Sequence, residues 1–178
     1  MNFFIQFLTY SRILVSPIIF LFITFFDFYG WALILFVLAS ISDYWDGYLA
    51  RKYNLESALG EVLDPIADKI LVTFLILALS IELASIFFAF VGGLILIREF
   101  WVSALRDFNG RTGNLKATKV TFLAKFKTTS QFMTFASFLL GLYLNNALLI
   151  FISNFFLFLA LIITIQTGLS YTIATFRK

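Results

Sequence analysis

The sequence predicts an all-α membrane protein with six transmembrane helices. Apolar residues occupy 61% of the 178 positions, and the mean hydropathy is +0.97, whereas soluble domains contain about 45–50% apolar residues. The apolar residues form continuous runs instead of alternating with polar ones, which favours helices over the strands of a membrane barrel. The runs are about 20 residues long, the length that an α-helix needs to cross a bilayer. We expect a single membrane domain over residues 1–178.

The predicted helices follow one another with short connections, so consecutive helices should be antiparallel neighbours. Their six ranges are Leu8–Phe28, Trp31–Ala50, Glu61–Ile81, Ile86–Leu105, Phe122–Leu144 and Leu148–Thr172. After the fourth range, residues 109–114 include two Asn and two Gly. This composition is typical of a turn, so we expect the fourth helix to end before it.

Basic residues gather at one end of this predicted bundle. Lys and Arg occur after the second range, between the fourth and fifth ranges and at the C-terminus. The connections near 27–30, 82–85 and 145–147 contain neither residue. Because cytoplasmic loops of membrane proteins are enriched in Lys and Arg, the pattern predicts that both termini are cytoplasmic.

Four aspartates lie near the cytoplasmic ends of the second and third ranges. Asp43 and Asp46 are three residues apart, and Asp64 and Asp68 are four apart, so each pair lies on one face of its helix. Asp43 and Asp68 each lie ~10 Å from the end of the helix. Because the chain contains no His or Cys, a metal site here would have oxygen ligands, which suit Mg²⁺ or Mn²⁺. The spacing therefore predicts a site where divalent ions neutralise the four carboxylates.

A group of basic residues accompanies the aspartates on the fourth and fifth ranges. Arg98 and Arg106 are eight residues apart, about 80° around a helix, so one groove can hold both. Lys125 and Lys127 open the fifth range together with hydroxyl and amide side chains. This sequence is too polar for a surface that faces lipid, so we expect it to line a water-filled cavity.

Two basic residues inside the predicted spans have more than one interpretation. Arg12, near the start of the first range, either extends to the membrane interface or contacts a ligand. Arg98 either binds a substrate or forms an ion pair with Glu99 or with one of the four aspartates. The residues alone leave these alternatives open.

A carboxylate metal site beside a basic pocket suits chemistry on the phosphate of a lipid substrate. Metal ions stabilise charge on attacking and leaving oxygens, and Arg and Lys bind a second anionic substrate. The same residues would also suit a divalent-cation transporter. That alternative lacks a polar path through the other half of the membrane, where Asp27 and Glu82 are the only charged residues.

The aspartates belong to a longer pattern, D-x2-D-G-x2-A-R-x8-G-x3-D-x3-D, which resembles the motif of the CDP-alcohol phosphatidyltransferase family. Every fixed position matches, from Asp43 to Asp68. The resemblance implies a six-helix membrane enzyme in which the four Asp bind two Mg²⁺ or Mn²⁺ ions. It also implies that Asp68 is the base for the acceptor hydroxyl. The residues it assigns to the CDP moiety are Gly47, Ala50, Arg51 and Gly60.

The second half of the chain is similar to the branch of this family that uses glycerol 3-phosphate as acceptor. The similar segments are 63–69, 98–99, 103–106 and 125–131, although Ala124 replaces a usual Gly and residues 2–6 lack a usual Asn-Pro-Asn lead. The implied reaction transfers the phosphatidyl group of CDP-diacylglycerol to glycerol 3-phosphate and releases CMP. The residues expected at the acceptor phosphate are Arg98, Arg106, Lys125 and Lys127.

The resemblance also implies the surroundings in which this reaction takes place. We expect a homodimer in the plasma membrane of a bacterium, with membrane lipids around it, the active site on the cytoplasmic side and no nucleic-acid partner. The alternative within the family is another acceptor, namely inositol phosphate, serine or phosphatidylglycerol.

Overall fold

The computed structural model describes residues 2–53, 58–114 and 122–177. Within these ranges it describes all side chains except those of residues 2–7, 44, 46–51, 53, 58, 59, 61, 62 and 122–125. The described residues form six α-helices and no strand, so the all-α prediction is confirmed. The helices are α1 (Asn2–Thr24), α2 (Tyr29–Tyr53), α3 (Ala58–Glu82), α4 (Ile86–Thr112), α5 (Phe122–Tyr143) and α6 (Ala147–Phe176).

Local capping explains where several of these helices begin and end. Ser85 caps the start of α4 by accepting a hydrogen bond from the backbone N–H of Phe88 at 3.2 Å, and Asn146 caps α6 in the same way. At the other end of α4, Gly113 adopts a left-handed conformation with φ of 73°, which glycine allows without strain. The turn expected over 109–114 is therefore wrong for 109–112, which form the last turn of α4.

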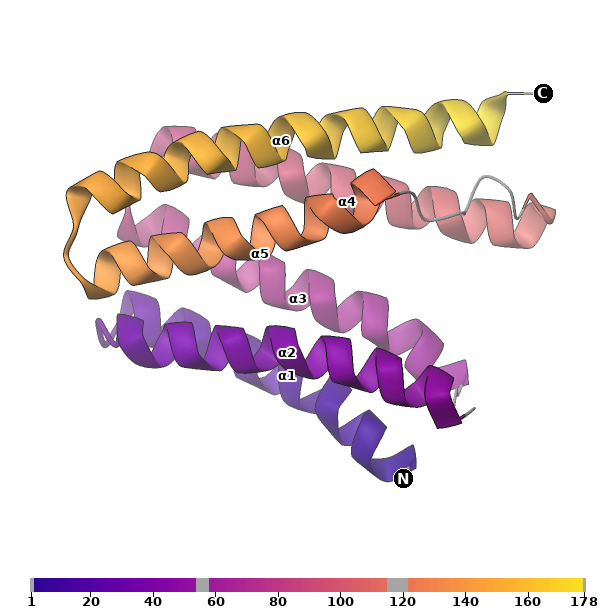
Figure 1. Ribbon diagram of the computed structural model, residues 1–178, viewed down its shortest axis with the longest axis horizontal. Helices are drawn as coiled ribbons and strands as arrows, with labels where there is room; N and C mark the ends of the chain where they lie inside the picture. Colours follow the sequence, from indigo (N-terminus) through magenta and orange to yellow (C-terminus); the bar gives the residue numbers. More distant parts are fainter. Residues whose placement is uncertain (1, 54–57, 115–121, 178) are drawn as a thin grey trace.

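The described parts of the six helices pack as a closed ring. Helix α1 contacts α2 and α3, helix α5 contacts α2 and α6, and helix α4 contacts α3 and α6. Consecutive helices are thus neighbours in the pairs α1–α2, α3–α4 and α5–α6, whereas α2 packs mainly against α1 and α5 rather than α3. Both termini lie at the same end of the bundle (Figure 1), as the even number of helices requires.

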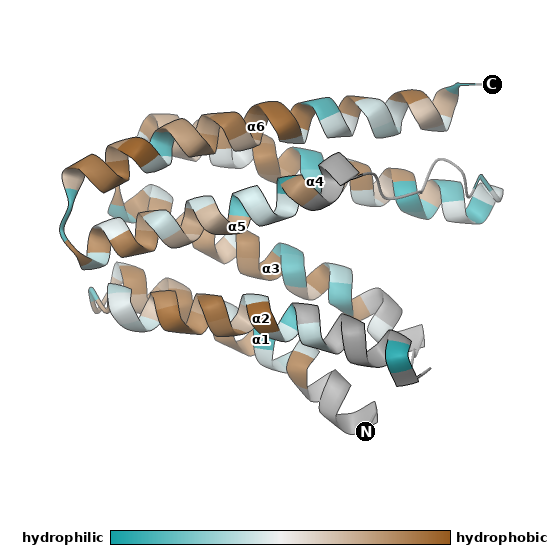
Figure 2. Cartoon of the chain, viewed as in Figure 1, coloured by the Kyte–Doolittle hydropathy of each residue, from teal (hydrophilic) through white to brown (hydrophobic). Residues whose placement is uncertain are grey.

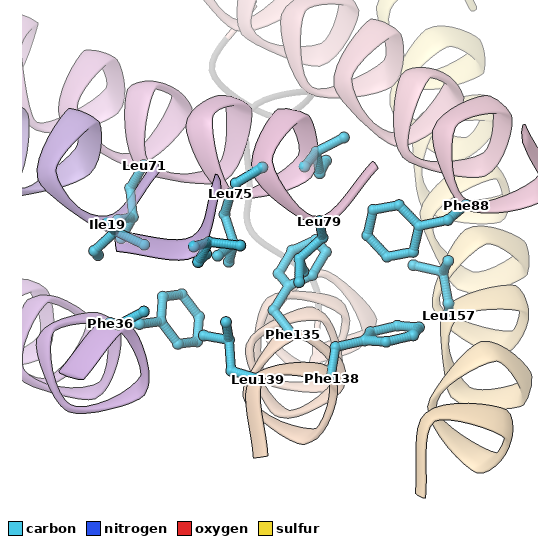
Figure 3. Packing of buried hydrophobic residues seen from close by; sticks show 14 of the residues in the cluster. Ile19, Phe36, Leu71, Leu75, Leu79, Phe88, Phe135, Phe138, Leu139 and Leu157 are labelled. Atoms are coloured by element: carbon cyan, nitrogen blue, oxygen red, sulfur yellow. The ribbon is translucent and has the colours of Figure 1, made fainter. Parts of the chain in front are cut away.

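The inside of the ring is a continuous apolar core. Figure 3 shows its side chains pointing toward one another from all six helices. The rings of Phe88 and Phe138 meet edge to face with centroids 5.0 Å apart, a favourable geometry for aromatic pairs. This close packing fixes the relative positions of the helices, and with them the polar groups nearer the termini. The labelled residues are Ile19, Phe36, Leu71, Leu75, Leu79, Phe88, Phe135, Phe138, Leu139 and Leu157.

The outer surface carries many large apolar side chains, such as Phe25, Ile86 and Phe151, each more than 70% exposed. Figure 2 shows apolar residues along most of the visible helices, with hydrophilic residues more frequent toward the end with the termini. In the described part of the chain, α4 and α6 are long and apolar enough to cross a membrane. That the other four helices also span the membrane stays a prediction. The cytoplasmic location of both termini stays a prediction too.

Candidate functional site

Three of the four predicted metal-binding aspartates meet around a single arginine. Arg12 of α1 is 1% exposed, and its guanidinium forms ion pairs with Asp43 of α2 and with Asp64 and Asp68 of α3. The Nη1–Oδ1 distance to Asp68 is 2.7 Å, and the Nη2–Oδ1 distance to Asp64 is 3.6 Å. Thr9 donates a further hydrogen bond to Asp64 at 2.8 Å. We call Arg12, Asp43, Asp64 and Asp68 the acid cluster.

The position of Arg12 excludes one interpretation that the sequence left open. A guanidinium paired to three carboxylates and almost fully buried does not extend to the membrane interface. The four groups of the acid cluster carry a formal net charge of −2, since three carboxylates surround one cation. A buried arginine with several carboxylate partners holds α1, α2 and α3 together at this level.

The acid cluster has the ligand chemistry of a divalent-ion site. The side chains of Asp43, Asp64 and Asp68 are 35%, 42% and 43% exposed, so they are partly accessible although Arg12 is buried. Hard ions such as Mg²⁺ prefer such oxygen ligands. Among the described side chains, which do not include that of Asp46, no group of three acidic residues is arranged to hold an ion.

The remaining motif residues occupy the adjoining ends of α2 and α3. Asp46, Gly47, Ala50 and Arg51 lie in the second half of α2, but their side chains are outside the described residues. Gly60 lies in the first turn of α3. Both halves of the motif are therefore helical, as the apolar runs Trp31–Ala50 and Glu61–Ile81 predicted. Contacts of these residues with a nucleotide stay predictions.

A cavity of about 300 Å³ lies beside the acid cluster, inside the ring of helices. Helices α3, α4 and α5 line it, and Arg98, Arg106 and Lys127 are among the lining residues. The structure thus brings together three of the four basic residues predicted for the acceptor, while the side chain of Lys125 is outside the described residues. We call this space the basic cavity.

Glu99 holds the two buried cations of the basic cavity. Its Oε1 accepts from the ammonium of Lys127, which is 5% exposed, and lies 3.3 Å from Nη1 of Arg98. The pairing of Arg98 with Glu99, one of the alternatives left open by the sequence, is therefore confirmed. A carboxylate in this position compensates the cost of burying two positive charges.

Hydrogen bonds to α6 fix the rest of the Arg98 side chain. Its Nε donates to the backbone carbonyl of Thr164 at 2.9 Å, and its Nη2 donates to Oγ1 of Thr167 at 2.7 Å. Gly168 makes this approach possible, because a Cβ there would lie 3.0 Å from Cγ of Arg98. Arg98 is thus held in one orientation, with Nη1 toward Glu99 and the cavity.

Arg106 and Lys69 complete the cationic lining. Arg106 is exposed, lies 5.2 Å from the ring centroid of Tyr171 and donates to its hydroxyl at 3.2 Å. Lys69 of α3 donates to Oγ of Ser103 of α4 at 2.6 Å. Together with Asp68 and Glu99, the charged lining residues are four cations and two carboxylates, a formal net charge of +2.

Asp68 and Lys69 join the two halves of the site. Asp68 pairs with Arg12 in the acid cluster and also lines the basic cavity, where its neighbour Lys69 is a lining residue too. An anionic group that metal ions hold at the acid cluster would therefore lie next to Asp68. A second anion in the basic cavity would lie next to the same residue. The sequence left a ligand contact of Arg12 as one of two alternatives, offered Glu99 only as an ion-pair partner of Arg98 and gave Lys69 no contact with a substrate, although a charge inside an apolar helix is itself a signal for function.

Comparison with known proteins identifies the family. The family model of CDP-alcohol phosphatidyltransferases matches residues 5–166. The chain is 41% identical over 176 residues to the CDP-diacylglycerol–glycerol-3-phosphate 3-phosphatidyltransferase of Rickettsia bellii, covering 93% of this chain and 91% of that protein. This chain belongs to the CDP-alcohol phosphatidyltransferase family. Proteins with the same name from Rickettsia felis and Salmonella typhimurium are 37% and 32% identical, over 93% and 72% of this chain and 91% and 72% of their own lengths.

Membership of the CDP-alcohol phosphatidyltransferase family fits the chemistry of both halves of the site. The family generally depends on divalent metal ions, and the donor set of the acid cluster consists only of carboxylate oxygens. The family match also includes both halves of the Asp motif and all the described cations of the basic cavity, since it ends only in α6. The family match therefore covers the described residues of both the acid cluster and the basic cavity.

Proposed function

We propose that this protein transfers the phosphatidyl group from CDP-diacylglycerol to sn-glycerol 3-phosphate, forming phosphatidylglycerophosphate and CMP. The observation that carries the proposal is the shared position of Asp68, between a cluster of carboxylates and a cavity of net positive charge. Relatives whose names contain this reaction match 72–93% of the chain at 32–41% identity. The reaction needs both parts, one for the diphosphate of the lipid and one for the phosphate of the acceptor.

The acid cluster would hold the metal ions and the diphosphate. Asp43, Asp64 and Asp68, together with Asp46, provide the carboxylates for Mg²⁺ or Mn²⁺, and we propose two ions. Ions bound there would stabilise the negative charge on the diphosphate. The CDP moiety would lie along the adjoining ends of α2 and α3, contacting the segment that contains Gly47, Ala50 and Arg51, together with Gly60.

The basic cavity would bind glycerol 3-phosphate. A phosphate monoester carries about −1.5 to −2 charges at neutral pH, which matches the formal net charge of +2 among the lining residues. Lys127, Arg98 and Arg106 can contact its oxygens, and Lys125 opens the same helix as Lys127. The same charge disfavours serine, which carries no net charge at neutral pH, as the acceptor.

Asp68 would act as the general base. Its carboxylate would take the proton from the attacking hydroxyl of the acceptor. The hydroxyl oxygen then forms a bond to the phosphorus that carries diacylglycerol, and the bond from this phosphorus to the oxygen of CMP breaks. Lys69, fixed by Ser103 at 2.6 Å, would hold the acceptor close to Asp68.

We further propose a setting for this activity. The chain would form one domain over residues 1–178, with all six helices in the bilayer of a bacterial plasma membrane. Both termini and the Asp motif would face the cytoplasm, as the distribution of Lys and Arg supports. The homodimer that the family resemblance implies belongs to the same proposal.

The test is release of CMP by the purified protein in detergent with CDP-diacylglycerol and Mg²⁺, with candidate acceptors added one at a time. We expect release with glycerol 3-phosphate and loss of release when a chelator removes the metal ions. Release with inositol phosphate, serine or phosphatidylglycerol instead would replace the acceptor and retain the role of the acid cluster. No release with any acceptor, from folded protein, would overturn the proposal.

A further inference from the structure

The basic cavity contains a carboxylate that binding of a phosphate does not explain. Among the described lining residues only Glu99 and Asp68 are acidic, and Asp68 is the proposed base. A carboxylate and a phosphate in the same cavity repel each other, because both are negatively charged. Pairing with Lys127 and Arg98 makes Glu99 stable in this position, yet a neutral side chain there would leave more positive charge for the phosphate. The negative charge of Glu99 therefore needs an explanation of its own.

The two oxygens of the Glu99 carboxylate have different surroundings. Oε1 accepts from the ammonium of Lys127 and lies 3.3 Å from Nη1 of Arg98. Oε2 has no hydrogen-bond partner among the described residues, and it is not one of the buried polar atoms that lack a partner. The side chain as a whole is 22% exposed. One oxygen thus holds the two cations, while the other is accessible and can accept a hydrogen bond from a ligand.

Three helices hold this carboxylate in place. Glu99 is part of α4, and its partner Lys127 belongs to α5. Its other partner, Arg98, is fixed by hydrogen bonds to Thr164 and Thr167 of α6. A ligand in the basic cavity therefore meets Oε2 at a defined position, and a site that is held in this way can select between ligands.

A phosphate can bind in the basic cavity without displacing Glu99. The ammonium of Lys127 carries three hydrogens, and its described contact with Glu99 uses one of them. Arg106 and Lys69 provide further donors in the lining. The cavity thus has room for a phosphate on its cations and for Glu99 beside it, so the carboxylate is available to the rest of the bound molecule.

Glycerol 3-phosphate has a group that Oε2 can bind. Of its two hydroxyl groups, the terminal one reacts at Asp68 in the proposed function, and the middle one does not react. A hydroxyl donates strongly to a carboxylate, since hydrogen bonds to charged groups are about twice as strong as those between neutral groups. Two uncharged polar lining residues, Ser103 and Gln131, already have hydrogen-bond partners on neighbouring helices.

We propose that Glu99 determines the specificity for the second substrate, because its Oε2 accepts a hydrogen bond from the hydroxyl that does not react. This inference rests on the proposed function and narrows the second substrate to phosphate monoesters with two neighbouring hydroxyl groups. A substrate without the middle hydroxyl leaves a charged oxygen unpaired beside it, which weakens binding. If Glu99 were only the counter-ion of Lys127 and Arg98, recognition of the middle hydroxyl would not depend on it.

The test compares glycerol 3-phosphate with 3-hydroxypropyl phosphate, which differs only in lacking the middle hydroxyl. We measure kcat/KM for CMP release with each compound. In the wild type the ratio of the two values should be about 30, as expected for a hydrogen bond to a charged group. In Glu99→Met, which keeps the length of the side chain but removes the carboxylate, the ratio should fall about tenfold. The control is Asp107→Asn, an exposed acid of the same helix outside the described lining, which should leave the ratio unchanged.

The ratio separates a role in specificity from a role in the fold. Loss of a counter-ion lowers kcat/KM for both compounds by the same factor, so an unchanged ratio in Glu99→Met would overturn the inference. A wild-type ratio near 1 would also overturn it and would leave the proposed function intact. If Glu99→Met is inactive with both compounds, Glu99→Gln takes its place, because the amide keeps the shape of the side chain without its charge. Its ratio should fall at least about threefold, and an unchanged ratio there would contradict the inference.

Binding measured by thermal unfolding does not depend on turnover. It tests the inference even if the wild type releases no CMP and the proposed function fails, or if both Glu99 variants are inactive. We expect glycerol 3-phosphate to raise the melting temperature of the wild type at a concentration about 30-fold lower than 3-hydroxypropyl phosphate requires. The two compounds should act alike on Glu99→Met. Equal effects of both compounds on the wild type, or no effect of either, would overturn the inference.

Discussion

The acid cluster and the basic cavity are built in the same way with opposite charges. In the acid cluster one cation, Arg12, contacts three carboxylates, and in the basic cavity one carboxylate, Glu99, contacts two cations. The two parts differ in which groups are buried. The carboxylates of the acid cluster are 35–43% exposed around a buried Arg12, whereas the side chains of Lys127 and Arg98 are only 6% and 10% exposed.

This difference indicates how each part meets its ligand. The acid cluster presents accessible carboxylate oxygens, which suits small ions that exchange with water. In the basic cavity the cations Arg98 and Lys127 are buried. A buried cation is stable only with an anion beside it. Glu99 provides that anion, so the acceptor phosphate that we propose for this cavity would meet cations that are already in position.

The largest effect should come from the residue that belongs to both parts. Asp68→Asn removes the proposed base and one metal ligand while keeping the shape of the side chain. We expect kcat for CMP release to fall about 10³-fold, within the range lost with a general base. The control is Asp107→Asn, because Asp107 is exposed and pairs only locally with Arg111 at 2.9 Å among its described partners. A rate near that of the wild type in folded Asp68→Asn would remove Asp68 from the mechanism.

Arg12 tests the acid cluster without any measurement of activity. Arg12→Gln leaves three half-buried carboxylates without their shared cation, and removing one partner of an ion pair destabilises a fold because the remaining charges are no longer compensated. We expect the melting temperature in chelator to fall, and Mg²⁺ to raise it more in Arg12→Gln than in the wild type, since the ions then replace the missing charge. Arg111→Gln is the exposed control.

One result would contradict the expected larger effect of Mg²⁺ on the melting temperature of Arg12→Gln. If Arg12→Gln is folded but Mg²⁺ no longer raises its melting temperature, then Arg12 shapes the ion site and does not substitute for the ions. The acid cluster and the basic cavity would then correspond only in their pattern of charges.

Lys127 provides the matching test in the basic cavity. Lys127→Met keeps the length of the side chain but removes a buried cation that contacts Glu99. We expect KM for glycerol 3-phosphate to rise about 30-fold, equivalent to about 2 kcal/mol for a charge-assisted hydrogen bond. The KM for CDP-diacylglycerol should stay within twofold of that of the wild type. An equal rise in both values would show that Lys127 supports the fold rather than the acceptor.

The sequence predicted the elements of this site better than their mutual contacts. Six helices followed from apolar runs long enough to cross a bilayer, and the second and third of these runs placed Asp43, Asp64 and Asp68 correctly on helices. The pairing of Arg12 with these aspartates depends on which helices pack at its level, and local spacing carries no such information. The same holds for Glu99 and Lys127, which are 28 residues apart and on different helices.

The end of α4 was mispredicted for a similar reason. Asn109 and Gly110 are typical turn residues, yet they continue the helix as far as Thr112. Asn109 is 1% exposed and its amide donates to Oγ1 of Thr175 on α6 at 2.8 Å. A contact between helices thus overrides the local preference, and it extends the polar contacts between α4 and α6 that also hold Arg98.

Gly168 allows the smallest and most local test of the comparison, because the atoms nearest to a Cβ at this position belong to Arg98. A Cβ at this position would lie 3.0 Å from Cγ and 3.3 Å from Nε of Arg98, so Gly168→Ala should push the guanidinium away from Thr167 and toward the cavity. We expect KM for glycerol 3-phosphate to change about fivefold, equivalent to about 1 kcal/mol. Gly93→Ala on α4 is the matched control, since a Cβ there would meet nothing within 4 Å. If both variants behave alike, the orientation of Arg98 does not matter for acceptor binding, and the hydrogen bonds from α6 serve only to join the helices.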